Sequence, residues 1–425
     1  MRSLIIKPVE AVEGDVTLPG SKSISNRALL LAAEAEGQTR LVNLLASDDT
    51  TRMLTALGQL DIRVLEDGDD HLVTGVAGPL VRDDRRLSLD LGLAGTALRP
   101  LTAALTLGNG VFDLDGTPRM RERPIAHLVD GLRQLGARIR YTGREGFPPI
   151  EVTGTGLRGG RVTMQGSVSS QFLTSLLLAA PLAAAPVEVL VEGEQVSKPY
   201  LDITVEMMGR FGATVGHEDH RVFRVEPGGY RSPGRYLIEG DASAASYFLA
   251  AGAIAGGGVC VHGIGSGSVQ GDMAFVEVLE AMGARVTVAA EWVRVEPGQL
   301  AGVDLDLNHI PDAAMTAAVL ALFADGPTRI RNIYNWRVKE TDRLAAMATE
   351  LKKVGAEVVE SEDSLTVNPP KNLNAATIDT YDDHRMAMCF SLAALGGVEI
   401  TINDPDCVSK TFPRYFQEFE RLARR

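Results

Sequence analysis

The sequence predicts an α/β protein of two domains that are built from one repeated helix-and-strand unit. A helix that ends at glycine and leads into an alternating strand recurs along the chain, with successive glycines 78, 76, 71 and 72 residues apart. A chain of 425 residues is also too long for one ordinary core. The two ends of the chain carry the missing parts of one further unit.

Each repeat reads as a hydrophobic residue, a glycine, a small residue and the start of a strand. The five copies are Leu57-Gly58, Leu135-Gly136, Phe211-Gly212, Met282-Gly283 and Val354-Gly355. Glycine suits the left-handed residue that follows a helix, and the next apolar residue begins a strand. Helix-ending glycines are common, but near-constant spacing favours repeated supersecondary units over chance.

The ends of the chain predict a sixth unit. Residues 3–9 (SLIIKPV) indicate a strand with no helix before it, and residues 412–424 indicate a helix with no strand after it. We therefore expect both termini in one domain, composed of residues 1–20 and 240–425, with residues 21–239 as the continuous domain.

Composition narrows the function classes. The chain is 45% hydrophobic and 23% charged, which is typical of a soluble globular protein. A net charge of −13 argues against extended nucleic-acid binding, whereas a small anion needs only a local cluster of cations. Three widely spaced cysteines indicate neither a disulfide framework nor zinc, and they fit a reducing cytoplasm. The N-terminus lacks the apolar core of a signal peptide, so a cytoplasmic location is expected.

The segment NWRVKETDR concentrates charge before an amphipathic helix. Lys339 and Arg343 are four residues apart, so on that helix they would share one side, with Glu340 nearby. Two cations beside one carboxylate suit an anionic ligand that exchanges a proton. The alternative is a solvated, salt-bridged first turn, to which Arg337 and Asp342 could belong.

Two further segments could bind anions through backbone groups. LPGSKSISNRALLLAA places Lys22, Ser23 and Arg27 at a helix start, without the glycine spacing of a P-loop. LGLAGTALRPL places Gly95, which allows close approach to the backbone, beside the Thr96 hydroxyl. Ordinary helix capping and connection are the alternatives.

Two polar segments add cations and neutral groups. In DGTPRMRERPI, the neighbouring prolines restrict the backbone that carries Arg123 and preorganise its guanidinium. GSVSSQFLT offers Ser169, Ser170 and Gln171, neutral groups that suit a polyhydroxy ring. A solvated basic loop and serine caps are the alternatives.

The remaining motifs lie in both halves of the chain. VSKPY contributes Ser197 and Tyr200, and IPDAAM places Asp312 at a helix start, as a cap or as a base for a hydroxyl. YDDHRM and VSKTF supply His384, Arg385 and Lys410, without metal-ligand spacing. Because the cations come from both expected domains, the sequence predicts an enzyme that handles two small, multiply charged anions between them.

These segments, together with EGDASAASYFLAA, resemble the 5-enolpyruvylshikimate-3-phosphate synthase family over nearly the whole chain. The resemblance implies a two-domain enolpyruvyl transferase fold (inside-out α/β barrel) with three βαβαββ repeats per domain and the active site in the cleft between the domains. It implies transfer of the enolpyruvyl group of phosphoenolpyruvate to the 5-hydroxyl of shikimate 3-phosphate, with release of phosphate. This is the shikimate-pathway step that glyphosate inhibits. No metal or organic cofactor is implied, and a monomer without nucleic-acid or membrane partners is expected.

The resemblance also assigns roles to residues. Those expected to bind shikimate 3-phosphate are Lys22, Ser23, Arg27, Ser169, Ser170, Gln171, Ser197, Tyr200, Asp312, Asn335 and Lys339. Those expected to bind phosphoenolpyruvate are Lys22, Gly95, Thr96, Arg123, Gln171, Arg343, His384, Arg385 and Lys410. The expected catalytic residues are Asp312, which takes the hydroxyl proton, and Glu340 or Lys22, which protonates the methylene carbon.

One position departs from the family. The glycine loop usually reads Leu-Gly-Asn-Ala-Gly-Thr, and this chain has Leu93 in place of the asparagine. We therefore expect weaker binding of phosphoenolpyruvate and an altered response to glyphosate.

Three other classes of protein fit the sequence less well. A UDP-N-acetylglucosamine enolpyruvyl transferase would carry a cysteine on its arginine-rich loop, and residues 115–123 have none. A non-catalytic anion-binding relative would not need both Asp312 and Glu340. An RNA-end-processing enzyme conflicts with the acidic balance.

Overall fold

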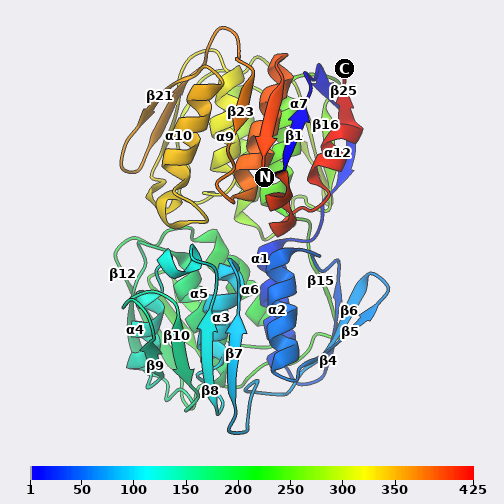
Figure 1. The fold of residues 1–425 in the computed structure, drawn as a ribbon. Coiled ribbons are helices and arrows are strands. Elements are labelled where there is room, and N and C mark those ends of the chain that lie inside the picture. The colour runs from blue at the N-terminus through cyan, green and yellow to red at the C-terminus, as the bar shows by residue number, and fades with distance from the viewer. Residues whose placement is uncertain (1) are drawn as a thin grey trace. The chain divides into compact units, whose positions relative to one another are not determined.

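The computed structural model describes residues 2–425, and the chain divides into two compact units. One, the continuous unit, is Gly20–Ile238; the other, the terminal unit, joins the N-terminal segment up to Pro19 to Glu239–Arg425. Strands from both ends of the chain belong to the terminal unit (Figure 1).

The continuous unit contains three four-stranded sheets, ordered β15-β4-β6-β5, β7-β8-β10-β9 and β11-β12-β14-β13. Its strands are β4 (Gln38–Val42), β5 (Arg63–Asp67), β6 (Asp70–Thr74), β7 (Arg86–Asp90), β8 (Val111–Asp115), β9 (Arg138–Tyr141), β10 (Ile150–Thr153), β11 (Gly160–Gln165), β12 (Val187–Glu192), β13 (Val215–Glu218), β14 (Val222–Val225) and β15 (Arg235–Leu237). Its helices are α1 (Lys22–Glu34), α2 (Asp48–Gln59), α3 (Gly95–Ala104), η1 (Met120–Glu122), α4 (Ala126–Gln134), α5 (Ser170–Ala179), η2 (Ala180–Leu182) and α6 (Pro199–Arg210).

The terminal unit contains three larger sheets, β1-β24-β23, β17-β18-β16-β3 and β19-β20-β22-β21, and the small pair β2-β25. Its strands are β1 (Ser3–Ile6), β2 (Ala11–Val12), β3 (Gly14–Thr17), β16 (Val259–His262), β17 (Arg285–Val288), β18 (Trp292–Glu296), β19 (Asp304–Asp306), β20 (Thr328–Arg331), β21 (Glu357–Glu360), β22 (Leu365–Asn368), β23 (Ala376–Ile378), β24 (Ile400–Asn403) and β25 (Ala423–Arg424). Its helices are α7 (Ala242–Ile254), η3 (Gly271–Ala274), α8 (Phe275–Met282), α9 (Ala314–Leu320), η4 (Ala321–Phe323), η5 (Tyr334–Val338), α10 (Arg343–Lys353), α11 (His384–Ser391), η6 (Leu392–Gly396), η7 (Pro405–Lys410) and α12 (Tyr415–Leu422).

The glycine repeat is confirmed at four of its five positions. Gly136, Gly212, Gly283 and Gly355 have φ values of +97°, +83°, +107° and +104°, the left-handed conformation predicted after a helix. The interpretation of Gly58 is wrong. It lies inside α2, which runs on to residue 59, and the left-handed residue there is Asp61 at φ +62°.

The sixth unit is assembled from both ends of the chain. β1 pairs antiparallel with β24, on whose other side β23 runs parallel. The C-terminal helix α12 is shorter than predicted, and the prediction that no strand follows it is wrong. Residues 423 and 424 form β25, which pairs with β2 because the chain end lies beside Ala11 and Val12. Besides the small pair β2-β25, six sheets of three or four strands in residues 2–425 confirm the predicted repeated α/β class.

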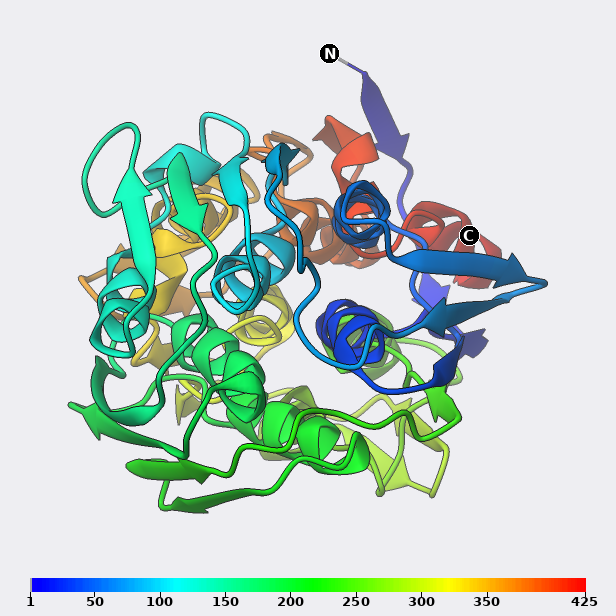
Figure 2. The same ribbon diagram turned by 90° about the horizontal axis from the view of Figure 1, so that it is seen from below.

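Three helices in each unit are almost wholly buried: α1, α3 and α5 in the continuous unit, and α7, α9 and α11 in the terminal unit. Others, such as α2 and α12, bury only one side. α7 is apolar on all sides and almost wholly buried, as a helix inside a core must be. Strands alternate instead: Ile150 and Val152 of β10 are buried, whereas Glu151 and Thr153 are half-exposed. Figure 2 shows the helices of the continuous unit inside a rim of strands. In residues 2–425 no helix is long and apolar enough to cross a bilayer.

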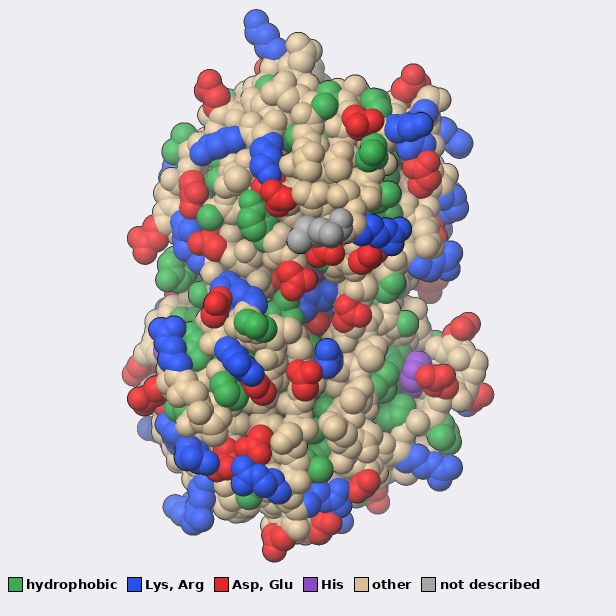
Figure 3. Space-filling model, viewed as in Figure 1, with side chains coloured by type: hydrophobic (Ala, Val, Ile, Leu, Met, Phe, Trp, Pro, Cys, Tyr) green, Lys and Arg blue, Asp and Glu red, His purple; other side chains and the backbone are tan. Residues whose placement is uncertain are grey.

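One face of the molecule carries charges of both signs (Figure 3). On the face shown in Figure 3, acidic and basic side chains are interspersed, and no broad basic patch gathers on that face.

Candidate active site

Asp312 is the centre of a charged cluster in the terminal unit. Its Oδ1 accepts a hydrogen bond from Arg343 Nη1 at 2.8 Å, and its Oδ2 accepts one from Arg385 Nη2 at 2.7 Å. Lys339 Nζ is 3.7 Å from Oδ1. The capping interpretation of Asp312 is wrong, because Ala313 is the N-cap of α9. The three cations instead orient the carboxylate and balance its charge.

Arg343 binds three carboxylates at once. Besides Asp312, it donates to Glu340 at 2.9 Å and, through Nε, to Asp383 at 2.7 Å, while only 1% of its side chain is exposed. Burial by itself would lower the pKa of Arg343, but the charges of the three carboxylates outweigh burial and raise that pKa. Arg343 therefore stays charged and fixes the positions of all three acids.

The predicted common helical side of Lys339 and Arg343 is wrong. α10 begins only at Arg343, because Asp342 is its N-cap and accepts from the Ala345 N–H. Lys339 and Glu340 lie before the helix and reach the cluster through their ion pairs with Asp312 and Arg343.

The predicted surface pair is confirmed nearby. Arg337 Nη1 lies 3.0 Å from Asp342 Oδ2, and Arg337 also binds Glu360. These contacts keep the Arg337 charge out of the Asp312 cluster.

Trp336 anchors this segment, and the sequence analysis missed it. Its side chain is fully buried, and its Nε1–H donates to the Pro311 carbonyl at 2.7 Å. The bond joins η5 to the residue that precedes Asp312. A tryptophan among polar residues was the available signal, because a buried indole needs an acceptor.

The start of α11 contributes further charged residues to the Asp312 cluster. Asp383 is the N-cap of α11, and His384 beside it is fully buried. Arg385 Nη1 donates to the buried Tyr247 hydroxyl at 3.0 Å, a positioning contact that the sequence did not indicate. Lys410, at the end of η7, is 6% exposed.

In the continuous unit, Gly95 lies against two guanidiniums. A Cβ at this position would be 2.4 Å from Arg99 Nη1 and 3.1 Å from both Arg123 Nη2 and Gln171 Oε1. Arg99 Nη1 donates to Gln171 Oε1 at 2.9 Å. A side chain at this position would displace the Arg99 guanidinium, so glycine preserves the arrangement of the three groups that converge there.

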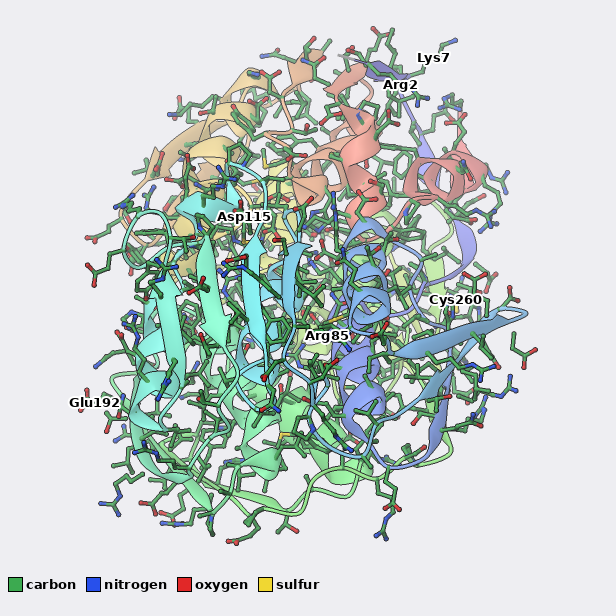
Figure 4. All side chains as sticks on the ribbon, turned by 60° about the horizontal axis from the view of Figure 1, so that its bottom comes forward. Arg2, Lys7, Arg85, Asp115, Glu192 and Cys260 are labelled. Atoms are coloured by element: carbon green, nitrogen blue, oxygen red, sulfur yellow. The ribbon has the colours of Figure 1, made fainter. Side chains whose placement is uncertain are left out.

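The arginine-rich loop directs one of its three guanidiniums inward. Arg121 binds Asp115, labelled in Figure 4, and Arg119 binds Glu122. Arg123 is 4% exposed and donates to the Leu93 carbonyl at 3.3 Å. Its buried Nε makes no hydrogen bond within residues 2–425, which is a costly state that an anionic ligand would relieve.

A polar network joins the start of α1 to the start of α3. Asn26 Nδ2 donates to Thr96 Oγ1 at 2.7 Å, and Thr96 Oγ1 donates to Asp49 Oδ2 at 3.3 Å. Lys22 Nζ is 3.9 Å from the same Asp49 oxygen. Asp49 is 3% exposed and was missed in the sequence, where it resembled an ordinary first-turn acid of α2.

Arg27 ties together the N-terminal parts of α1, α5 and α6. Its Nε donates to Thr204 at 3.0 Å, and its other nitrogens donate to Thr174 and to the carbonyls of Ser23 and Tyr200. Burial lowers the pKa of Arg27 to about 10. The guanidinium thus positions these helix starts around a buried positive charge.

The serines lie at two of these helix starts. Ser169 is the N-cap of α5 and accepts from the Gln171 N–H, and Ser170 is its first residue. Ser197, just before α6, has φ +55°. Helix N-termini attract anions because their backbone N–H groups lack partners in the helix.

The predicted site residues fall into two sets. Those in the continuous unit are Lys22, Ser23, Arg27, Gly95, Thr96, Arg123, Ser169, Ser170, Gln171, Ser197 and Tyr200. Those in the terminal unit are Asp312, Asn335, Lys339, Glu340, Arg343, His384, Arg385 and Lys410. Direct contacts join Asp312, Lys339, Glu340, Arg343 and Arg385.

Comparisons with known proteins agree over the full chain. The family model described as EPSP synthase (3-phosphoshikimate 1-carboxyvinyltransferase) matches residues 6–419. A 3-phosphoshikimate 1-carboxyvinyltransferase of Yersinia pestis bv. Antiqua (strain Angola) is 59% identical, covering 100% of this chain and 99% of the relative. One from Shewanella loihica is 58% identical and covers 100% of both chains.

Solved structures share the fold. The EPSP synthase from Acinetobacter baumannii superposes with a TM-score of 0.82 at 25% identity, covering 99% of this chain and 98% of the other. The enolpyruvyl transferase NikO from Streptomyces tendae superposes with a TM-score of 0.79 at 21% identity, over 99% and 98% of the two chains. From these matches, the chain belongs to the EPSP synthase (3-phosphoshikimate 1-carboxyvinyltransferase) family.

Proposed function

We propose that the chain transfers the enolpyruvyl group of phosphoenolpyruvate to the 5-hydroxyl of shikimate 3-phosphate. Membership of the family supports this reaction. The observation that carries the proposal is the Asp312 cluster, in which a carboxylate is held by two guanidiniums at 2.8 and 2.7 Å and an ammonium at 3.7 Å. Such an arrangement suits proton transfer beside anionic substrates.

The helix starts around Arg27 are assigned to the phosphate of shikimate 3-phosphate. Ser169, Ser170 and Ser197 offer hydroxyls, and the N-termini of α5 and α6 offer backbone N–H groups. The carboxylate and hydroxyls of the sugar-like ring are assigned to Gln171, Tyr200, Asn335 and Lys339. The three neutral side chains suit the uncharged hydroxyls, and the Lys339 ammonium suits the carboxylate.

The cations near Gly95 and in the terminal unit are assigned to phosphoenolpyruvate. Arg123 has a buried Nε without a hydrogen bond in the described chain, and Gly95 lets the ligand approach the backbone. Lys22, Arg385 and Lys410 supply further positive charge. Charge-assisted bonds to phosphate and carboxylate oxygens are the strong ones in proteins, so these groups would dominate affinity.

The chemical step is an addition followed by an elimination. The 5-hydroxyl oxygen attacks C2 of phosphoenolpyruvate while Asp312 takes the hydroxyl proton, and Glu340 or Lys22 gives a proton to the methylene carbon. The C2–O bond to phosphate then breaks, and the new methyl group returns one proton to form the enolpyruvyl product. The surrounding cations stabilise the charge of the tetrahedral adduct.

The test is phosphate release from purified protein. Release that requires both shikimate 3-phosphate and phosphoenolpyruvate is expected. No release, or release only when a UDP-sugar replaces shikimate 3-phosphate, would refute the proposed reaction. Omitting each substrate in turn controls for a contaminating phosphatase.

The oligomeric state and the cellular location of the protein are predictions from the sequence. We expect a monomer by size-exclusion chromatography with light scattering, and enrichment in the cytoplasmic fraction after cell lysis. A stable dimer would contradict the first, and recovery with membranes would contradict the second.

A further inference from the structure

We propose a peripheral site for a divalent transition-metal ion, Zn²⁺ foremost, formed by Asp202, His217 and His220 in the continuous unit. Asp202 lies on α6, His217 on β13, and His220 in the turn between β13 and β14. One possible ligand atom from each of the three side chains lies within 4.8 Å of the other two. None of the three takes part in the proposed enolpyruvyl transfer.

The three side chains already converge. His220 Nε2 is 2.6 Å from Asp202 Oδ1, and the two imidazole centroids are 4.6 Å apart. Zinc binds imidazole nitrogen and carboxylate oxygen at about 2.0–2.2 Å, which separates two tetrahedral ligand atoms by about 3.3 Å. Binding of the ion would lengthen the hydrogen bond between His220 and Asp202 by less than about 1 Å. The His217 ligand atom, which lies within 4.8 Å of the other two, would take up the same separation of about 3.3 Å.

The hairpin turn fixes the positions of both imidazoles. Asp219 and His220 have φ values of +46° and +57°, and the Arg221 N–H donates to the Glu218 carbonyl at 2.8 Å. This is the mirror-image turn of tight hairpins, which usually carries asparagine or glycine. Beneath it, the ring of the fully buried Phe223 lies 5.3 Å from that of His217. The imidazoles are therefore held near each other before any ion binds.

The donor set selects the class of ion. Two imidazoles and one carboxylate suit Zn²⁺, Co²⁺, Ni²⁺ or Cu²⁺, whereas Mg²⁺ and Ca²⁺ prefer oxygen ligands. The Asp202 side chain is 48% exposed and His217 is exposed, so water can complete the coordination shell. Arg224 belongs to the other face of the hairpin and is bound to Glu188 and Glu218.

A second cluster provides a natural comparison. Asp15, Cys260 and His262 also bring their ligand atoms within 4.8 Å of one another, on β3 and β16, where Figure 4 labels Cys260. Arg294 is the cross-strand neighbour of Cys260, and Arg421 donates to the Asp15 carbonyl. These two cations oppose a metal ion there, so the Asp202 cluster is the stronger site.

The site has a structural consequence for the helix that follows Ser197. Asp202 lies one turn into α6, whose Thr204 accepts from Arg27. A metal that joins Asp202 to the hairpin would restrain this helix against β13. We therefore expect bound Zn²⁺ to raise the thermal stability of the protein, because an ion that binds only the folded state stabilises it.

The experiment titrates tag-free, full-length protein with Zn²⁺ by calorimetry in a buffer that does not bind metals. One site per chain is expected. The double variant His217→Gln/His220→Asn should lose at least about tenfold in affinity. Asparagine is chosen at residue 220 because it tolerates the left-handed conformation. Asp202→Asn, which leaves the turn unchanged, should also weaken binding.

The matched control is Cys260→Ser/His262→Gln, which should bind Zn²⁺ like the wild type and show the same rise in melting temperature. Co²⁺ should give a visible spectrum without a thiolate charge-transfer band. No binding to the wild type would overturn the proposal. So would full affinity in the His217 and His220 variant, or loss of binding in the control with a thiolate band in the wild type.

Discussion

The two charged regions of the molecule compensate their buried charges in different ways. Around Asp312 in the terminal unit, cations are matched to carboxylates, and Arg343 alone binds three acids. Near Gly95 in the continuous unit, Arg123 and Arg99 donate to neutral oxygens of Leu93, Gln171 and Pro124. One region pairs its charges internally, and the other presents positive charge held by neutral groups.

The difference indicates a division of work between the regions. A cluster of paired acids and bases is preorganised to move protons, because each acid has a fixed orientation and a nearby cation. A guanidinium that is held by neutral oxygens keeps its charge for a ligand. The first region should therefore govern turnover, and the second should govern affinity for the anionic donor.

The largest expected effect is that of Asp312→Asn. The amide keeps the shape of the side chain but cannot accept the hydroxyl proton, so kcat should fall by about 100- to 10,000-fold. Both KM values should change little, because the cations around the site remain. Steady-state kinetics with each substrate varied in turn measures the split.

The control for this variant is Asp325→Asn, which changes an exposed aspartate of the same unit. It should retain full activity. An Asp312→Asn enzyme with unchanged kcat and a raised KM would assign Asp312 to binding alone, and the proposed division would fail.

A smaller, different effect is expected for Arg123→Lys. Lysine keeps the charge but loses the planar pair of donors, so the KM for phosphoenolpyruvate should rise by about 10- to 100-fold. The KM for shikimate 3-phosphate should stay nearly constant. Arg121→Lys, on the same loop but bound to Asp115 at the surface, is the matched control. An equal rise in both KM values would contradict the assignment.

These regions also show what the sequence could predict. The ordered motifs led to the family and to the residues that meet around Asp312, because each motif carries unusual polar residues at a helix start. The prediction that Lys339 and Arg343 share one side of a helix was wrong, because Asp342 caps α10 and Lys339 lies before it. Trp336, Tyr247 and Asp49 were missed because their contacts depend on chain segments far away in the sequence.

The Asp202 cluster was missed for a related reason. His217 and His220 are three residues apart, which is a visible metal-ligand spacing, but their partner Asp202 comes from the preceding helix. Only the packing of the hairpin beside α6 supplies the third ligand.

Glu34 in α1 is a buried carboxylate without the cations that surround Asp312. It therefore shows what an uncompensated buried acid does to the stability of the protein. Neither of its oxygens has a hydrogen-bond partner within the described chain, and burial raises its pKa well above the ordinary 4.5. Because the pKa of Glu34 is raised in the folded protein, this residue does not reduce the free energy of unfolding below pH 4.5. As the pH rises from 4.5 toward the pKa of the folded protein, the protein loses stability.

Glu34→Gln removes this loss because the amide is neutral at every pH. The melting temperature of the variant should exceed that of the wild type at pH 8, and the difference should shrink as the pH is lowered to 4.5. Glu36→Gln, at a largely exposed neighbouring position, should show no such trend. A difference that is constant with pH would show that Glu34 is not the responsible group.

The smallest expected effect is that of Leu93→Asn. A polar side chain beside the carbonyl that holds Arg123 should restore one hydrogen bond near phosphoenolpyruvate and lower its KM by about two- to tenfold. Leu93→Ala is the comparison that separates the gain of an amide from the loss of the leucine. Equal KM values for the asparagine variant and the wild type would show that the side chain at position 93 does not affect the binding of phosphoenolpyruvate.

The most direct test of the central claim, that the transfer proceeds by addition and elimination with a proton added to the methylene carbon, is the reaction in D₂O. Addition–elimination places a solvent deuteron on the methylene carbon of phosphoenolpyruvate before phosphate leaves. The account predicts deuterium in the methylene group of a fraction of the product, detected by mass spectrometry. Product formed with no deuterium at that carbon would show that the carbon is never protonated, and would contradict the account.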